Sequence, residues 1–330
     1  MQKTSFTLGV DVSINTLDVY CLEVQKHERI FNNSSGFKAF SSFCRQNEID
    51  LKDAIVVLEY TGGYEYKLLQ YCQSKNISFV RIPGLAIKRS LGIVRGKNDK
   101  VDAARIAQYG DEKYKALSPE KPLNASISKL KELLGFRKKL IRENASYKAT
   151  IKERKHMYEV GNDNFIIKSL SKKLKVNEKE IESTEQQIEA VVQADYEVYK
   201  NYLLIKSIRG IGKVNAWMTI AYTENFSSFK NARSYAVYVG VIPFDYQSGT
   251  SIRGKKRVSR IANKELKQEL NQAARSAIQW DKEMREYATR KLRDKAYGIV
   301  LNNVKFKLIL RMFAIVKRGE NYVDNYTIAA

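Results

Sequence analysis

The chain has 330 residues, of which 44% are apolar, so it is long enough for two compact units with cores of their own. Its formal net charge of +22, from 58 Lys and Arg against 36 Asp and Glu, favours a polyanionic partner, nucleic acid before an anionic membrane surface. Three widely spaced cysteines and two histidines exclude a zinc finger and a disulfide framework.

The first 120 residues alternate between strand and helix patterns. Apolar and β-branched residues predict strands over 5–12, 16–24, 28–32, 54–60 and 77–83. Helices are expected over 36–47, 64–74 and 98–112, the last capped by Asn98. This order predicts an α/β domain over residues 1–120, with a mixed sheet and helices on its faces. The chain opens on a strand pattern without a signal peptide or a membrane-length apolar run, so we expect a cytoplasmic protein.

Residues 121–200 have a different character, because Lys, Glu and Gln replace the β-branched runs, and they predict long helices. A seven-residue repeat predicts a packed coiled-coil seam of Ile167, Leu174, Ile181 and Ile188 in one column and Leu170, Asn177, Thr184 and Val191 in the other. The stretch GNDN at 161–164 predicts a turn, so an antiparallel hairpin is the simplest arrangement, although the seam could also form between chains. We assign it no chemistry.

Residues 201–330 are expected to form a mostly helical unit that ends in a helix near 302–317. Residues 253–311 contain seventeen Lys and Arg but only six Asp and Glu, so much of the excess positive charge lies here. The stretch SIRGIGKVNA resembles a helix-hairpin-helix turn, in which Gly210, Gly212 and Lys213 would meet a nucleic-acid phosphate. The alternative is a tight turn packed between two helices.

Another basic run precedes this unit. Four cations of the helical region could hold a nucleic-acid backbone or form a solvated helix face: Arg137, Lys138, Lys139 and Arg142.

Four carboxylates lie where strands end or a helix begins. These are Asp11, Glu59, Asp99 and Asp102, and the last two share one helix face because they are three residues apart. Mg²⁺ prefers such oxygen ligands, and a pair of ions could flank a scissile phosphate. The alternative is a set of ordinary capping or surface acids, although an acid that interrupts an apolar strand end needs a partner.

The stretch FDYQSGTSIRGKKRVSR at 244–260 places Ser248 next to a glycine and close to five cations: Arg253, Lys255, Lys256, Arg257 and Arg260. A serine nucleophile needs a base or a metal, and cations that stabilise the phosphate it attacks. A loop hydroxyl is an equal alternative for Ser248, and we favour turn or cap roles for Ser251 and Ser259. Tyr246 is a weaker candidate nucleophile, because tyrosine recombinases also use a histidine and none lies beyond residue 156.

The ordered blocks GVDVS, LEYTGGYEYKLLQYC and KNDKVDAARIAQY, followed by LLIKSIRGIGKVNAWMTIAY and YAVYVGVIPFDYQSGTSIRGKKRVSRIANKELKQELNQAA, resemble the insertion sequence 110 group of transposases. The resemblance implies an N-terminal DEDD domain with an RNase H fold like that of the Holliday-junction resolvase RuvC. It implies a metal-binding tetrad of Asp11, Glu59, Asp99 and Asp102, and Ser248 as the nucleophile of the second domain. One departure is Arg81-Ile82-Pro83-Gly84, where the family usually has Asn-Pro.

The resemblance further implies a recombinase that uses Mg²⁺ or Mn²⁺, acts on donor and target DNA, is guided by a bridge-type RNA, and assembles as a dimer to tetramer. The domains would then be 1–120, 121–200 and 201–330. Two alternatives stay open. One is a metal-dependent nuclease or junction resolvase that hydrolyses DNA with the acidic tetrad alone, and the other is a non-catalytic RNA-binding scaffold.

Overall fold

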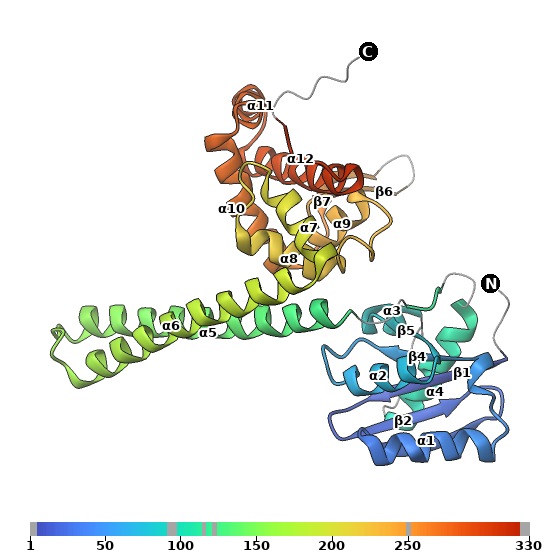
Figure 1. Ribbon diagram of the computed structural model, residues 1–330. Coiled ribbons are helices and arrows are strands. Elements are labelled where there is room, and N and C mark those ends of the chain that lie inside the picture. Colours follow the sequence, from blue (N-terminus) through green and yellow to red (C-terminus); the bar gives the residue numbers. More distant parts are fainter. Residues whose placement is uncertain (1–4, 91–97, 114–116, 121–123, 249–251, 324–330) are drawn as a thin grey trace. The chain divides into compact units, whose positions relative to one another are not determined.

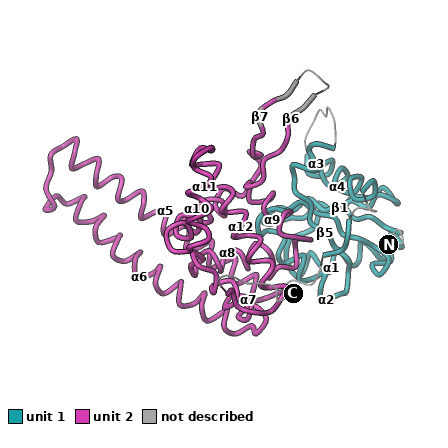
Figure 2. The backbone as a smooth tube through the Cα atoms, turned by 90° about the horizontal axis from the view of Figure 1, so that it is seen from above, with its two compact units in different colours: residues 1–123 teal, residues 124–330 magenta. Residues whose placement is uncertain are grey.

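The computed structural model describes residues 5–90, 98–113, 117–120, 124–248 and 252–323. Contacts divide the chain into two compact units, Met1–Leu123 and Asn124–Ala330 (Figure 2). The helical region expected over 121–200 is therefore grouped with the residues that follow it.

The first unit contains a five-stranded mixed sheet. Its strands are β1 (Phe6–Val12), β2 (Thr16–Cys21), β3 (Lys26–Phe31), β4 (Ala54–Glu59) and β5 (Ser78–Ile82), arranged in the order β3-β2-β1-β4-β5. The pairs β1–β2 and β2–β3 are antiparallel, whereas β4 runs parallel to both β1 and β5. The prediction of a mixed sheet is confirmed, and this topology is compatible with an RNase H-like DEDD domain.

Helices cover both faces of this sheet (Figure 1). The helices α1 (Ser34–Gln46) and α2 (Tyr66–Ser74) share a core with alternate residues of β1, β2 and β4. The remaining residues of β4 face α3 (Gly84–Ser90) and α4 (Asp99–Lys113), and a single 3₁₀ turn, η1 (Leu51–Asp53), precedes β4. Sequence analysis missed α3, but Asn98 caps α4 as expected, since its side chain accepts from the Val101 amide at 2.8 Å.

Glycine allows α4 to lie directly against β1. A Cβ atom at Gly9 would stand 2.2 Å from the Ala103 carbonyl oxygen and 2.3 Å from the Ala107 nitrogen. Gly110 of α4 lies equally close to β4, because a Cβ atom at Gly110 would stand 2.6 Å from a methyl carbon of Val57. The backbone of α4 therefore touches the backbone of β1, and the first turn of α4 is fixed beside the end of that strand.

The second unit begins with two long helices, α5 (Ala125–Met157) and α6 (Phe165–Ala194), which pack together as a hairpin (Figure 1). The predicted heptad seam is buried or half-buried along α6. The Asn177 amide donates to Glu143 of α5 at 3.2 Å, so this polar seam position is paired within the chain. The seam of α6 thus packs against α5 of the same chain.

Six further helices form the main core of this unit: α7 (Tyr196–Lys206), α8 (Lys213–Thr223), α9 (Ala232–Val239), α10 (Lys264–Trp280), α11 (Lys282–Leu292) and α12 (Tyr297–Arg318). The largest fully buried side chains are Trp217 and Tyr235. Ile127 and Leu130 of α5 and Ile188 of α6 join the same cluster, which explains why the helical hairpin does not separate as a unit of its own.

A β-hairpin of β6 (Pro243–Ser248) and β7 (Ile252–Val258) was not predicted. Strand β7 carries Arg, Lys and Gly where strands usually carry β-branched residues, so local propensity gave no signal for it, although Phe244 and Tyr246 of β6 are residue types typical of strands. Within the described ranges, no helix is both long and apolar enough to cross a membrane.

Replacing Gly9 by Ala tests the contact between α4 and β1. The new methyl group would overlap the backbone of α4, so we expect Gly9→Ala to lower the free energy of unfolding by about 1–3 kcal/mol. Gly135→Ala is the matched control, because a Cβ atom there meets nothing within 4 Å in the exposed interior of α5, and it should be neutral or stabilising by up to about 1 kcal/mol. Urea unfolding followed by circular dichroism measures both. Equal stability of the two variants would contradict the close packing.

Candidate active site

The sheet directs three carboxylates toward α4. Leu8, Val10 and Val12 of β1 face the core beneath α1 and α2, so the alternating pleat points Asp11 to the opposite face. Glu59 follows the same rule at the end of β4, two residues beyond Val57. Asp18 of β2 lies directly opposite Asp11 in the antiparallel register.

The first turn of α4 adds Asp99 and Asp102 to this face. Burial is the largest cause that raises the pKa of Asp11, followed by the negative charges of Asp99, Asp102, Asp18 and Glu59 in that order, and together they bring this pKa to about 6. The other three predicted carboxylates therefore lie close enough to act on Asp11 electrostatically, as does Asp18.

Gly84 makes room for Glu59. A Cβ atom at this position would stand 1.9 Å from the Glu59 Oε1 atom, so the carboxylate lies against the backbone at the start of α3. Residues 81–84 depart from the family pattern, but Gly84 at the end of this stretch leaves the space that the Glu59 carboxylate occupies. A larger residue here would displace the Glu59 side chain.

Two arginines pair with the acids of α4. The Arg29 guanidinium lies 2.5 Å from Asp99 Oδ2 and 3.0 Å from Asp18 Oδ2, and Arg105 Nη1 lies 3.0 Å from Asp102. His27 Nε2 lies 2.8 Å from the other Asp18 oxygen, so the buried Asp18 has two cationic or polar partners on β3. Sequence reasoning missed Asp18 and Arg29, although an acid inside an apolar strand was a signal of the same kind as Asp11.

The donor set suits a hard divalent cation, because carboxylate oxygens are the ligands that Mg²⁺ and Mn²⁺ take. Over the described ranges, no three His, Cys, Asp or Glu side chains are grouped as ligands. Asp99 and Asp102 are instead paired with Arg29 and Arg105. A metal ion would therefore have to compete with these arginines for the two α4 carboxylates.

Ser248 is the last residue of β6, and its backbone pairs with Ile252 of β7. The side chains of Ser248, Arg253 and Lys255 lie outside what the structure describes, as do residues 249–251, which include the alternative Ser251. Of the other predicted cations, Arg257 and Arg260 are exposed, and Lys256 Nζ lies 2.7 Å from Asp245 across the hairpin. The hairpin thus carries exposed positive charge on strands that lead to the serine.

The glycine turn before α8 packs against α10. Gly210 has a left-handed backbone with φ of +94°, and a Cβ atom there would stand 2.7 Å from the Ala273 carbonyl oxygen. Gly212 is open and precedes Lys213, whose Nζ lies 2.5 Å from Glu185 Oε2. This packing fits the alternative of a turn held between helices, and the phosphate-binding role of Gly210, Gly212 and Lys213 stays a prediction.

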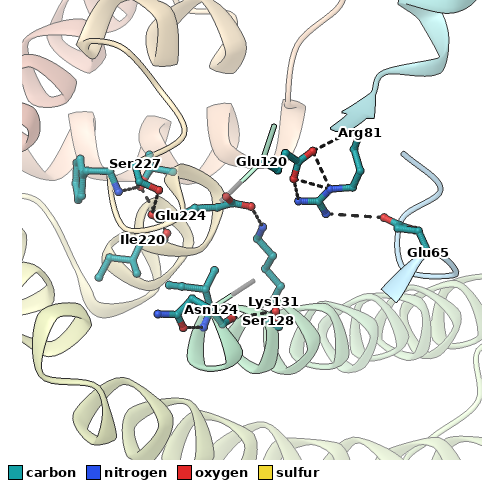
Figure 3. Close-up of polar contacts among 12 residues, drawn as sticks. Glu65, Arg81, Glu120, Asn124, Ser128, Lys131, Ile220, Glu224 and Ser227 are labelled. Carbon is teal, nitrogen blue, oxygen red and sulfur yellow. Dashed lines mark hydrogen bonds and ion pairs between the residues drawn. The ribbon is translucent and has the colours of Figure 1, made fainter. Parts of the chain in front are cut away.

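Several of the α5 cations are engaged by acids of their own unit. Arg137 pairs with Glu185 at 2.8 Å and Lys138 with Glu265 at 2.5 Å. Lys139 and Arg142 are exposed on the same helix. Near the start of α5, Lys131 pairs with Glu224 at 3.0 Å (Figure 3). Part of the basic run thus holds the second unit together.

Arg81 has a structural role in the first unit. Its guanidinium donates to Glu120 at 2.5 and 2.9 Å and approaches Glu65 at 4.0 Å (Figure 3). It also lies 5.2 Å from the centre of the Tyr60 ring. Arg81 thus links the end of β5 to the loop after β4.

Replacing Asp11 by Asn tests the acidic environment. Because the pKa of Asp11 is raised from 3.8 to about 6, its ionisation destabilises the fold as pH rises from about 4 through about 6. We expect Asp11→Asn to raise the free energy of unfolding of the metal-free protein by about 1 kcal/mol at about pH 8, discounted from the full shift because the side chain is only half-buried. The difference should vanish below about pH 4. Urea unfolding in a chelator across this range measures it, and a pH-independent difference would contradict the assignment.

Comparison with known proteins fits this arrangement. A profile for the IS110 DEDD domain, described as a transposase, matches residues 8–157, and a profile described as the IS116/IS110/IS902 transposase family matches residues 202–289. The "Pilin gene-inverting protein" of Moraxella lacunata is 27% identical over 278 residues, which cover 82% of this chain and 81% of that protein. The protein of the same name from Moraxella bovis matches to the same extent. The first profile spans all four carboxylates and the second spans the glycine turn and the β6–β7 hairpin, so the chain belongs to the IS110 family of transposases.

Proposed function

We propose that this transposase cuts and rejoins DNA by transesterification, with the four carboxylates and Ser248 serving one reaction. The observation that carries the proposal is that Asp11 and Glu59 occupy the face of the sheet that α4 covers, while Asp99 and Asp102 lie in the first turn of α4, near enough that their charges and burial raise the pKa of Asp11. Carboxylates gathered at such a cost to the fold are typical of an active site.

In the proposed reaction, Ser248 attacks a phosphodiester of the DNA. A bond forms between Oγ and phosphorus as the bond from phosphorus to a deoxyribose oxygen breaks, and the hydroxyl proton ends on that leaving oxygen. A deoxyribose hydroxyl of another strand then attacks the phosphoserine, and the serine regains its proton. The energy of the broken bond is kept in the covalent link, so rejoining needs no ATP.

Asp11, Glu59, Asp99 and Asp102 would hold Mg²⁺ or Mn²⁺. Divalent ions bound there would act as Lewis acids that polarise the phosphodiester and favour ionisation of the attacking hydroxyl. Arg257 and Arg260, exposed near the base of the hairpin, would neutralise phosphate charge. Arg253, Lys255 and Lys256 are proposed to do the same.

Donor and target DNA are the proposed substrates, with a bridge-type guide RNA as the specificity partner. Support for DNA rearrangement comes from the two Moraxella relatives, whose name describes the inversion of a gene. The net charge of +22 supports binding of both nucleic acids. Cutting both strands of two duplexes uses four active sites, which four chains would supply, so we propose a homo-oligomer in the cytoplasm that ranges from a dimer to the complete tetramer.

Trapping of the covalent link tests the proposal. With guide RNA and both DNA partners supplied, the wild-type chain should form a protein–DNA adduct that survives denaturation, and Ser248→Ala should abolish it. Asp11→Ala should abolish cleavage as well, because the carboxylates act in the same step. Ser259→Ala is the matched control and should keep the adduct.

The alternatives predict different results. Undiminished cleavage by Ser248→Ala would replace the recombinase with a hydrolytic nuclease that uses the acidic tetrad alone. Absence of cleavage by the wild-type chain, with RNA binding retained, would favour a scaffold.

Arg29 gives a test of the metal site that does not depend on activity. Since Arg29 pairs with Asp99, Arg29→Gln should bind Mn²⁺ about three- to fivefold more tightly, the size of a largely exposed ion pair. The same change should lower the thermal stability of the metal-free protein. Arg45→Gln removes an exposed arginine of α1 and is the charge-matched control. Weaker Mn²⁺ binding by Arg29→Gln in an electron paramagnetic resonance titration would show that Arg29 does not compete with the metal.

A further inference from the structure

Aromatic side chains gather immediately after Glu59. Tyr60, Tyr64 and Tyr66 are 51%, 52% and 41% exposed, and Leu85 at the start of α3 is 43% exposed. One face of the Tyr60 ring is covered by Arg81, whereas the half-exposed rings of Tyr64 and Tyr66 can take part in further contacts. The proposed catalytic acid Glu59 is thus followed at once by an exposed aromatic surface.

The loop that carries these rings is held firmly. Glu65, only 2% exposed, accepts hydrogen bonds from the Thr61 hydroxyl and from the Gly63 amide, the latter at 2.9 Å. Arg81 lies 4.0 Å from the same carboxylate. A buried acid therefore fixes the loop from inside, and the tyrosines are presented without the entropy cost of ordering a mobile segment on binding.

A second clamp ties Tyr64 to the strand end that carries Asp11. The buried Asn32 amide donates to the Ser13 carbonyl at 3.1 Å and to the Tyr64 carbonyl at 2.9 Å. Ser13 lies two residues beyond Asp11, and Tyr64 lies five beyond Glu59. Tyr64 is thus fixed at the sheet edge where both carboxylates lie.

Positive charge accompanies the aromatic rings. Lys67 of α2 and Lys88 and Arg89 of α3 are exposed on the helices that begin beside this loop. Aromatic rings interleaved with cations are typical of surfaces that bind single-stranded nucleic acid, because bases stack on the rings while the cations follow the backbone. A fully paired duplex hides its base faces and could use only the cations.

We propose that the loop of residues 60–66 is a base-stacking platform for unpaired DNA next to the scissile phosphate, with Tyr64 as its main ring. The inference rests on the proposed function, because it takes the carboxylate edge as the place of DNA cleavage. It adds a substrate feature to that function: DNA is unpaired where it enters the acidic site. The ring stacks on a base and takes no part in bond making or breaking.

The test uses the full-length protein and DNA that carries 2-aminopurine in a short unpaired bubble, with the paired duplex for comparison, in the presence of a chelator. The wild-type chain should quench the 2-aminopurine fluorescence of the bubble, and Tyr64→Ala should lose most of this quenching and bind the bubble at least about fivefold more weakly, the smaller end of what stacking on one base contributes. Tyr64→Phe should retain both properties. Binding to the paired duplex should not change.

Tyr158→Ala is the control variant. Its ring is 64% exposed at the end of α5, away from the loop in sequence and in the second unit, so its removal should leave the quenching unchanged. Thermal unfolding of Tyr64→Ala checks that the fold is kept, and Tyr66→Ala gives a second removal from the same platform should that variant prove unstable.

Unchanged quenching in both Tyr64→Ala and Tyr66→Ala would overturn the proposal, as would equal losses on bubble and duplex. The result is independent of the covalent chemistry because no bond is cut in the chelator. A missing Ser248 adduct would therefore remove the proposed reaction and leave the stacking result standing. Retained adduct formation with unchanged quenching would remove only the platform.

Discussion

The close contact between α4 and β1 is the constraint on which the acidic site depends. Gly9 leaves no side chain between strand and helix, so Ala103 and Ala107 lie on the backbone of β1. Asp99 lies one helical turn before Ala103, and Asp102 directly precedes Ala103 in the sequence. A helix held farther from the sheet by a side chain would carry both carboxylates away from Asp11, so the small residues of this contact determine where the charges meet.

Bringing like charges together needs compensation, and the chain provides it with its own cations. Arg29, anchored on the buried Asp18, neutralises Asp99, and Arg105 neutralises Asp102. Asp11 has neighbouring acids instead, and its pKa rises to about 6. The arginines thus offset part of the repulsion among the carboxylates. In the proposed metal site, a divalent ion would replace the arginines on the α4 acids and would stabilise the carboxylates more strongly. Arg29 would still have Asp18 as a partner after such an exchange.

Sequence patterns predicted the first unit well, because its strands alternate or run apolar and its helices have clear starts. The positions of Asp11, Glu59, Asp99 and Asp102 at element ends followed from the same patterns. The pairing of Arg29 with Asp18 and Asp99 could not be predicted, since it depends on the register of β2 with β3 and on the approach of α4. The β6–β7 hairpin escaped prediction because β7 consists mostly of Arg, Lys and Gly, although Phe244 and Tyr246 of β6 are residue types typical of strands. The pairing of Lys213 with Glu185 joins elements distant in sequence and left no local signal.

We propose that the contact between α4 and β1 builds one divalent-cation site from four carboxylates. Anomalous diffraction from crystals of the protein soaked in Mn²⁺ tests it most directly. We expect manganese among Asp11, Glu59 and the two α4 aspartates, with Arg29 withdrawn from Asp99 and still paired with Asp18. Manganese bound elsewhere on the first unit, with Arg29 still on Asp99 and no ion among these acids, would contradict it.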